Sequence, residues 1–171
     1  FSESEDLSKR FKVKLGGIPY DAKFLFDEIG YNFLHPEMGA AFGNAQLDKL
    51  SRFRKVRERN FSALSRIFRQ YERFFILPKQ DIRAKTQWLA FPLTIKKQAP
   101  FSRLAIAMFL EKHNVQTRPI FTGNILKQPG FKHIAHTVPR GGCPITDDIM
   151  ERGFVVGCHQ GLTAAHINRL K

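Results

Sequence analysis

The feature that most constrains the fold is a long helical pattern in the first half of the chain. Apolar side chains recur at three- and four-residue steps from Leu47 to Tyr71, with charged residues between them. That period is typical of an amphipathic helix with one face buried in a core. Pro36 and Glu37 suit a first helical turn, because proline loses no hydrogen bond there and an acidic side chain favours the positive helix end. The pattern therefore predicts a helix over residues 36–73.

The beginning of this helix is rich in small residues, namely Gly39, Ala40, Ala41, Gly43 and Ala45. A glycine inside a helix costs about 1 kcal/mol relative to alanine. We therefore expect a compensating gain, which is usually the close approach of another backbone or of a ligand.

Shorter patterns flank the long helix. Residues 11–16 alternate like a strand and are followed by a glycine turn. After the helix, the sequence predicts strands over 74–77, 86–96, 115–121 and 154–158, a helix from Pro100 to His113, a helix beginning near Thr146, a helix capped by Thr163, and a long loop over 122–145. Pro92 indicates that the 86–96 strand lies at the edge of the sheet or contains a bulge. This order predicts an α+β fold with helices on one face of a small sheet.

The chain is strongly basic, with 28 basic and 15 acidic residues and a net charge of +13. One interpretation is a polyanionic partner, either nucleic acid or a phosphorylated ligand. The other is that lysine and arginine cover solvated faces. No finger, RNA-recognition or basic-zipper signature accompanies the charge, so we expect no nucleic-acid partner. No run of 18 apolar residues occurs, so we also expect no membrane partner.

Cysteine and histidine give weak signals. Cys143 and Cys158 are too few for a disulfide scaffold and suit a reducing cytoplasm. His133 and His136 have a spacing that could share a helical face, but the flanking glycines and prolines favour a loop. We therefore expect no metal site.

Three blocks of sequence resemble one family. GYNFLHPEMGAAFGNAQLDKL, residues 30–50, is similar to the turn and helix that mark the entrance to the small domain of DegT/StrS-family enzymes, which use pyridoxal phosphate (PLP). VQTRPIFTGNILKQPGF, residues 115–131, resembles a motif of members that remove or replace a sugar 3-hydroxyl. GFVVGCHQGLT, residues 153–163, resembles the family's strand, turn and helix near the C-terminus.

The resemblance implies the small C-terminal domain of a fold-type-I PLP enzyme, with a long helix and a mainly antiparallel sheet. It divides the chain into a lead-in and active-site loop over 1–35, a connecting helix over 36–73 and a small α+β domain over 74–171, truncated at both ends. Because the chain starts at Phe1 without a methionine, we interpret it as a piece of a longer enzyme.

The same resemblance implies roles for single residues. Asn32 would reach the PLP phosphate of a neighbouring subunit in a homodimer, although its turn also fits a plain Asx turn. Tyr31, Arg118, Asn124 and His159 would bind substrate. A strand-end arginine can form a fork on phosphate, but it can equally make a structural ion pair. Asn124 and His159 can also be simple turn residues.

We expect no catalytic residue in this chain, because the family's lysine or histidine over the cofactor lies upstream. The implied function is a PLP-dependent aminotransferase or 3-dehydratase of nucleotide-linked 4-keto-6-deoxy sugars, in deoxysugar, aminosugar and surface polysaccharide synthesis. The RPIFTGN block favours the dehydratase branch. The alternative is a non-catalytic basic module that binds a nucleotide sugar or nucleic acid.

Overall fold

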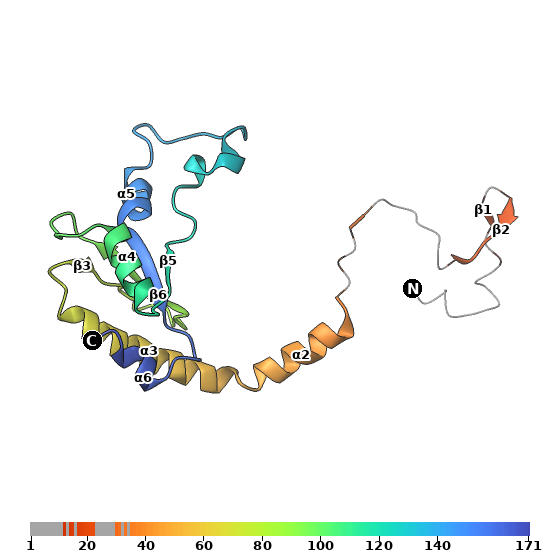
Figure 1. Ribbon diagram of the computed structural model, residues 1–171. Helices are drawn as coiled ribbons and strands as arrows, with labels where there is room; N and C mark the ends of the chain where they lie inside the picture. Colours follow the sequence, from red (N-terminus) through yellow and green to blue (C-terminus); the bar gives the residue numbers. More distant parts are fainter. Residues whose placement is uncertain (1–11, 13, 16, 23–29, 32, 34) are drawn as a thin grey trace. The chain divides into compact units, whose positions relative to one another are not determined.

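The computed structural model describes residues 12, 14–15, 17–22, 30–31, 33 and 35–171. The chain divides into two compact units, Phe1–Gly43 and Asn44–Lys171. In the first unit, β1 (Lys14–Leu15) and β2 (Ile18–Pro19) form an antiparallel hairpin (Figure 1). Gly17 turns the hairpin with a φ of +85°, which glycine adopts without steric cost.

The predicted long helix is interrupted once. Helix α2 (Glu37–Leu47) ends just before Asp48, and α3 (Leu50–Arg69) begins just after Lys49. The Lys49 N–H donates to the Gln46 carbonyl, three residues back, so a single tight turn separates the helices. The 36–73 segment is therefore two helices followed by turns, and α3 carries the amphipathic pattern.

The second unit is built on a four-stranded sheet. Its strands are β3 (Phe75–Ile76), β4 (Ala90–Ile95), β5 (Thr117–Pro119) and β6 (Gly153–Gly157), in the order β3-β4-β6-β5. All three pairings are antiparallel. The remaining elements are α4 (Arg103–Lys112), the 3₁₀ turns η3 (Ile125–Lys127) and η4 (Pro129–Phe131), α5 (Pro144–Arg152) and α6 (Ala164–Asn168). The predicted α+β class is confirmed.

One face of the sheet carries the core, and α3 supplies its main cover. Figure 1 shows that α6 lies beside α3, the long helix of this unit. Burial alternates along β4, as expected for a strand with one covered face. The buried apolar side chains are Leu64, Ile67, Phe68, Phe75, Phe91, Leu93, Ile95, Phe154, Val156, Cys158 and Ile167.

Aromatic rings fill the centre of this core. Phe91 is fully buried, and its ring lies 5.5 Å from that of Phe68 and 5.2 Å from that of Phe61, both on α3. Phe75 meets Phe68 edge to face at 5.7 Å. Such pairs stabilise beyond the area that they bury. The phenylalanines of this unit therefore join helix and sheet.

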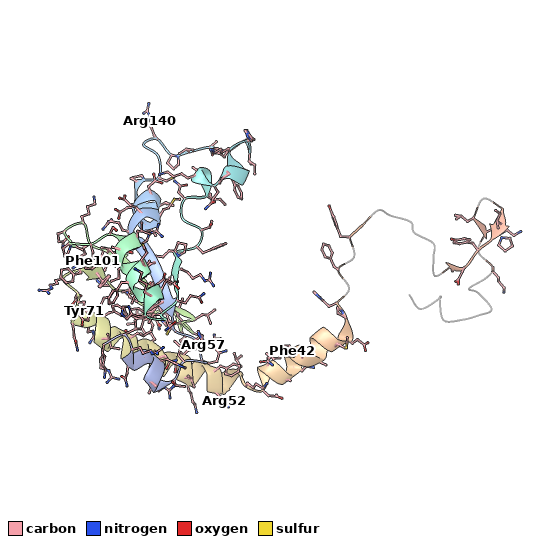
Figure 2. All side chains as sticks on the ribbon, in the orientation of Figure 1. Phe42, Arg52, Arg57, Tyr71, Phe101 and Arg140 are labelled. Atoms are coloured by element: carbon pink, nitrogen blue, oxygen red, sulfur yellow. The ribbon has the colours of Figure 1, made fainter. Side chains whose placement is uncertain are left out.

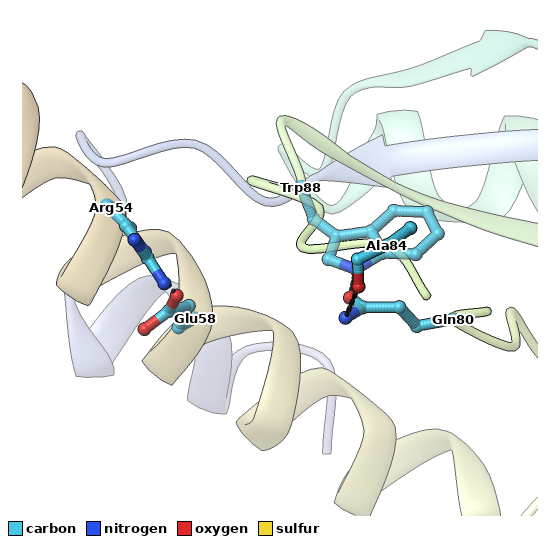
Figure 3. A network of polar contacts seen from close by, with 5 residues as sticks. All are labelled: Arg54, Glu58, Gln80, Ala84 and Trp88. Atoms are coloured by element: carbon cyan, nitrogen blue, oxygen red, sulfur yellow. Dashed lines mark hydrogen bonds and ion pairs between the residues drawn. The ribbon is translucent and has the colours of Figure 1, made fainter. Parts of the chain in front are cut away.

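The connection between β3 and β4 is fastened to α3 by Trp88. Its ring stacks on Phe61 at 4.7 Å, and its Nε1–H donates to the Gln80 side-chain oxygen at 3.1 Å. The Gln80 amide nitrogen in turn donates to the Ala84 carbonyl at 2.8 Å (Figure 3). These contacts hold the loop, which has no regular structure, against the helix.

Two local expectations need correction. The prediction that Pro92 marks an edge or a bulge is wrong about the strand order, because β4 lies between β3 and β6. Proline is tolerated because β3 pairs only with Thr94 and Ile95, so the strand has no β3 partner beside Pro92. Helix α5 begins at Pro144 instead of near Thr146, because proline suits a first helical position.

The cap of the last helix follows the prediction. The Thr163 hydroxyl accepts the His166 N–H, and His166 Nδ1 accepts the Thr163 N–H, forming a reciprocal capping box. Across the described part of the chain, no helix is both long enough and apolar enough to cross a membrane.

Phe91→Ala should lower the free energy of unfolding by about 3–5 kcal/mol, because it opens a cavity between α3 and the sheet. Leu89→Ala is the matched control. Leu89 precedes the same strand but is 59% exposed, so its change should stay within about 0.5 kcal/mol. Denaturant unfolding of both variants measures the difference. Similar small losses would show that Phe91 does not organise the core.

Candidate functional site

Two of the substrate-binding candidates, Arg118 and His159, line one cavity of about 540 Å³. Arg118 lies in β5 opposite Val155 of β6, and His159 follows the end of β6. Residues paired across an antiparallel ladder project on the same face of the sheet. Arg118 and His159, 41 positions apart in sequence, therefore share a site because β5 and β6 are neighbours.

The rest of the lining is mostly apolar or basic, with Asn114 and Gln116 as neutral polar residues. Leu89, Val155 and Leu162 contribute apolar walls, while His166 and Arg169 come from α6 and its C-terminal cap. No carboxylate is among the described residues that line the cavity. The site therefore favours a ligand that combines negative charge with less polar surfaces.

Arg118 has a free guanidinium within the described chain. Its side chain is exposed, and no carboxylate there lies within ion-pair distance of it. Glu111 is the nearby acid, but its Oε1 accepts from the Thr117 N–H at 2.5 Å and from the Thr117 hydroxyl at 2.9 Å. These bonds, with a smaller effect of the Arg118 charge, hold the pKa of Glu111 below its usual range. The structural ion pair considered for Arg118 is not seen.

The turn that carries His159 is pinned to α3. The Asn60 amide, which is 2% exposed, donates to the His159 carbonyl at 2.9 Å and to the Leu162 carbonyl at 3.4 Å. Arg57 Nε donates to the Gln160 side-chain oxygen at 2.8 Å. A buried amide that holds two carbonyls restricts the turn strongly, because leaving such groups unpaired is unfavourable.

The imidazole of His159 is oriented by its own turn. Its Nδ1 accepts the Gly161 N–H at 3.1 Å, so in the neutral ring the proton lies on Nε2. A side chain at Gly161 would meet the ring at 3.0 Å, and one at Gly157 would meet it at 3.4 Å. The two glycines therefore leave room for a ring that can offer Nε2–H to a ligand oxygen.

Asn124 lies apart from this cavity. It is 5% exposed, its side-chain oxygen accepts the Leu126 N–H at 3.0 Å, and its amide donates to Asp147 at 2.7 Å. Lys127 pairs with the same carboxylate at 2.8 Å. The hydrogen bond from Lys127, followed by that from Asn124, lowers the pKa of Asp147. In this arrangement Asn124 caps η3 and anchors the loop to α5, and its substrate role stays a prediction.

The first unit contains two of the predicted site residues, Tyr31 and Asn32. Tyr31 is 87% exposed and lies 5.6 Å from Phe33, ring to ring. Asn32, predicted to reach the cofactor phosphate, lies outside the described residues. Of Tyr31 and Asn32, the structure places only Tyr31, whose aromatic side chain is exposed to solvent.

Cys158 is a packing residue. It is fully buried, its thiol lies 3.8 Å from the Arg57 carbonyl, and burial raises its pKa to about 11. It is therefore a neutral thiol at physiological pH and no nucleophile. Across the described residues, no three histidine, cysteine or acidic side chains gather closely enough to hold a metal ion.

Sequence reasoning missed three residues of the site. Asn60 looked like one polar position on a helix, yet it holds the turn of His159. His166 and Arg169 follow the Thr163 cap, and only the packing of α6 against α3 brings them to the cavity. A polar residue on the otherwise apolar face of α3 was the one available signal, because such residues are buried only with a partner.

Asn60→Ala should lower the free energy of unfolding by about 1–3 kcal/mol and speed amide hydrogen exchange at residues 159–162. Arg54→Ala is the control on the same helix. Its ion pair with Glu58 is exposed (Figure 3), so its loss should cost no more than about 0.5 kcal/mol. Unchanged exchange in the Asn60 variant would show that the turn holds itself.

Two curated proteins are similar to most of this chain. RfbH, a lipopolysaccharide biosynthesis protein of Salmonella typhimurium, is 35% identical over 94% of the chain and 37% of its own length. A dTDP-4-dehydro-2,6-dideoxy-D-glucose 3-dehydratase of Saccharopolyspora spinosa is 34% identical over 91% of the chain and 34% of its own length. The chain thus spans about a third of the length of each of these relatives.

Solved structures agree with the fold. GDP-4-keto-6-deoxy-D-mannose-3-dehydratase of E. coli, determined with bound hydrated PLP, superposes with a TM-score of 0.76 at 30% identity. That match covers 86% of this chain and 37% of the dehydratase. The sequence also matches one enzyme family over residues 1–170, so the chain belongs to the DegT/DnrJ/EryC1/StrS aminotransferase family.

Proposed function

We propose that the protein acts on nucleotide-linked 4-keto-6-deoxy sugars with PLP as cofactor, and that this chain forms part of the substrate site. The observation that carries the proposal is the cavity shared by Arg118 and His159, which has basic and apolar walls. The diphosphate of a nucleotide sugar is the anionic part that such a site can hold. Arg118 would bind a phosphate oxygen through its planar fork, and His159 Nε2–H would donate to a sugar or phosphate oxygen.

Within this function we favour the 3-dehydratase type over the aminotransferase type. The RPIFTGN block, residues 118–124, supports it, and so do the 3-dehydratases among relatives at 31–34% identity. PLP, when bound, supplies an electron sink for bonds broken next to the sugar's keto carbon. We assign no catalytic residue to these 171 residues. A cytoplasmic location fits the two free thiols, Cys143 and Cys158.

Arg118→Ala should raise KM for the nucleotide sugar by about 10- to 100-fold, because a hydrogen bond to a charged group is worth about 1.5–3 kcal/mol. Its melting temperature should stay near that of the wild type, since the guanidinium makes no hydrogen bond or ion pair within the described chain. Arg140→Ala, at an exposed loop position, is the control and should leave KM unchanged. An unchanged KM with a large loss of stability would show that Arg118 is structural.

We further propose that the protein is a homodimer and that Asn32 reaches the PLP phosphate of the partner subunit. Amide and turn donors of this kind suit a phosphate. A side chain at Gly39 or Gly43 would meet nothing within 4 Å, so this part of α2 leaves room for a second backbone. The division of the chain into a lead-in, a connecting segment and a small domain belongs to the same proposal.

Asn32→Ala should release PLP more readily, seen as a loss of cofactor absorbance on dialysis, while the dimer stays intact by light scattering. Asn44→Ala, an exposed asparagine of α2, is the control and should keep its cofactor. Equal retention in both variants would show that Asn32 does not hold the phosphate. A wild-type protein that never binds PLP would instead support the non-catalytic binding module.

A further inference from the structure

The outer side of α3 carries a row of cations that the proposed function does not use. Arg52, Lys55, Arg59, Arg66 and Arg69 are all exposed, at steps of three, four, seven and three residues. At 3.6 residues per turn these side chains fall within an arc of about 100°. They span about 26 Å along the helix axis at a rise of about 1.5 Å per residue. These five residues are called the basic stripe.

The basic stripe faces away from the core. Leu64, Ile67 and Phe68 place the opposite side of α3 against the sheet. Figure 2 labels Arg52 and Arg57 on this helix, and Arg57 turns inward, to Gln160. Among the stripe residues, Arg59 donates to the side-chain oxygen of Asn60 at 3.4 Å. The stripe is therefore an exposed row on a helix whose opposite side is packed in the core.

Acidic side chains do not neutralise the basic stripe. Helix α3 contains one acidic residue, Glu58, and its carboxylate is bonded to Arg54, which is outside the stripe. Within the described chain, none of the five stripe cations forms an ion pair. Lys55 and Arg59 are four residues apart, and Arg66 and Arg69 are three apart, so like charges repel along the helix. An ordinary solvated face mixes both signs and avoids this cost.

We propose that the basic stripe is a docking surface for an anionic phospholipid membrane, which the protein meets peripherally. A flat anionic surface can contact a straight row of cations along its whole length. Each lysine or arginine near such a surface adds to the attraction. Lys171, which shares a shallow surface depression with Arg66, broadens the basic face. This inference revises the expectation, drawn from the absence of an apolar run, that the protein meets no membrane.

The geometry fits a plane better than a nucleic acid. A recognition helix enters the major groove, which is about 12 Å wide, and contacts base edges with side chains near its N-terminal end. The stripe cations are instead spread over about 26 Å of the helix. Helix α3 is packed against the sheet and against α6, so only its outer arc is open. Proteins bind single-stranded nucleic acid largely by stacking bases on exposed aromatic rings. All of α3 lies within the described residues, and its one exposed large apolar side chain is Leu50, which is not aromatic. Binding to the membrane would accordingly be electrostatic and reversible, with no inserted apolar wedge.

The test is sedimentation of the intact protein with large vesicles of 30% phosphatidylglycerol and 70% phosphatidylcholine, compared with phosphatidylcholine alone. The wild type should bind the anionic vesicles in 50 mM NaCl, release them in 500 mM NaCl and ignore the neutral ones. The triple variant Lys55→Gln/Arg66→Gln/Arg69→Gln should bind on the order of 100-fold more weakly. None of these three side chains makes a hydrogen bond or an ion pair within the described chain, so the variant should fold normally.

The control variant is Lys79→Gln/Lys85→Gln/Arg140→Gln, which removes the same charge from exposed positions outside α3. It should lose less than about threefold in affinity. Equal losses in both variants would show that net charge alone drives binding and would overturn the proposal. Failure of the wild type to bind anionic vesicles would also overturn it, as would stripe-dependent binding of a 20-base-pair DNA duplex in place of vesicles. None of these results depends on the enzyme's activity.

Discussion

The packing of α3 against β4 is the contact on which the second unit depends. Phe91 packs against the rings of Phe61 and Phe68, and burial of apolar surface of this kind is the dominant favourable term in folding. The candidate site follows from the same contact. Asn60 lies on the buried side of α3, so the helix that completes the core also holds the turn of His159. Stability and site geometry therefore rest on one helix, and the outer side of that helix is left free to carry charge.

Periodicity predicted the elements that bury one face. The helical pattern identified α3. The alternation of Leu89, Phe91, Leu93 and Ile95 predicted one face of the 86–96 strand, and the structure buries the last three but leaves Leu89 59% exposed. Thr163 marked the start of α6 because a hydroxyl followed by helical residues has few other uses. These signals are local. The structure agrees with them because local preference and tertiary packing favour the same helices and strands.

Strand order and helix ends were harder to predict. Pro92 suggested an edge because proline cannot donate to a ladder, but the neighbouring β3 is too short to need that donor. The predicted helix start near Thr146 was two residues late, because Pro144 suits the first helical position. In the site, Arg118 and His159 were predicted and share a cavity. Asn124 is buried, because its side chain bonds to the Leu126 N–H and to the Asp147 carboxylate. A sequence pattern does not reveal these two partners.

The lengths of the strands have a consequence for the behaviour of this unit in a crowded cell. Both outer strands are minimal: β3 has two residues, and β5 has three and ends in Pro119. Unpaired backbone groups at a sheet edge can recruit a strand from another molecule, and short edges offer little for such pairing. The longer apolar strands, β4 and β6, each lie between two neighbours. The segments most able to self-associate are thus exposed only when the sheet itself opens, so resistance to aggregation is built into the order of the strands.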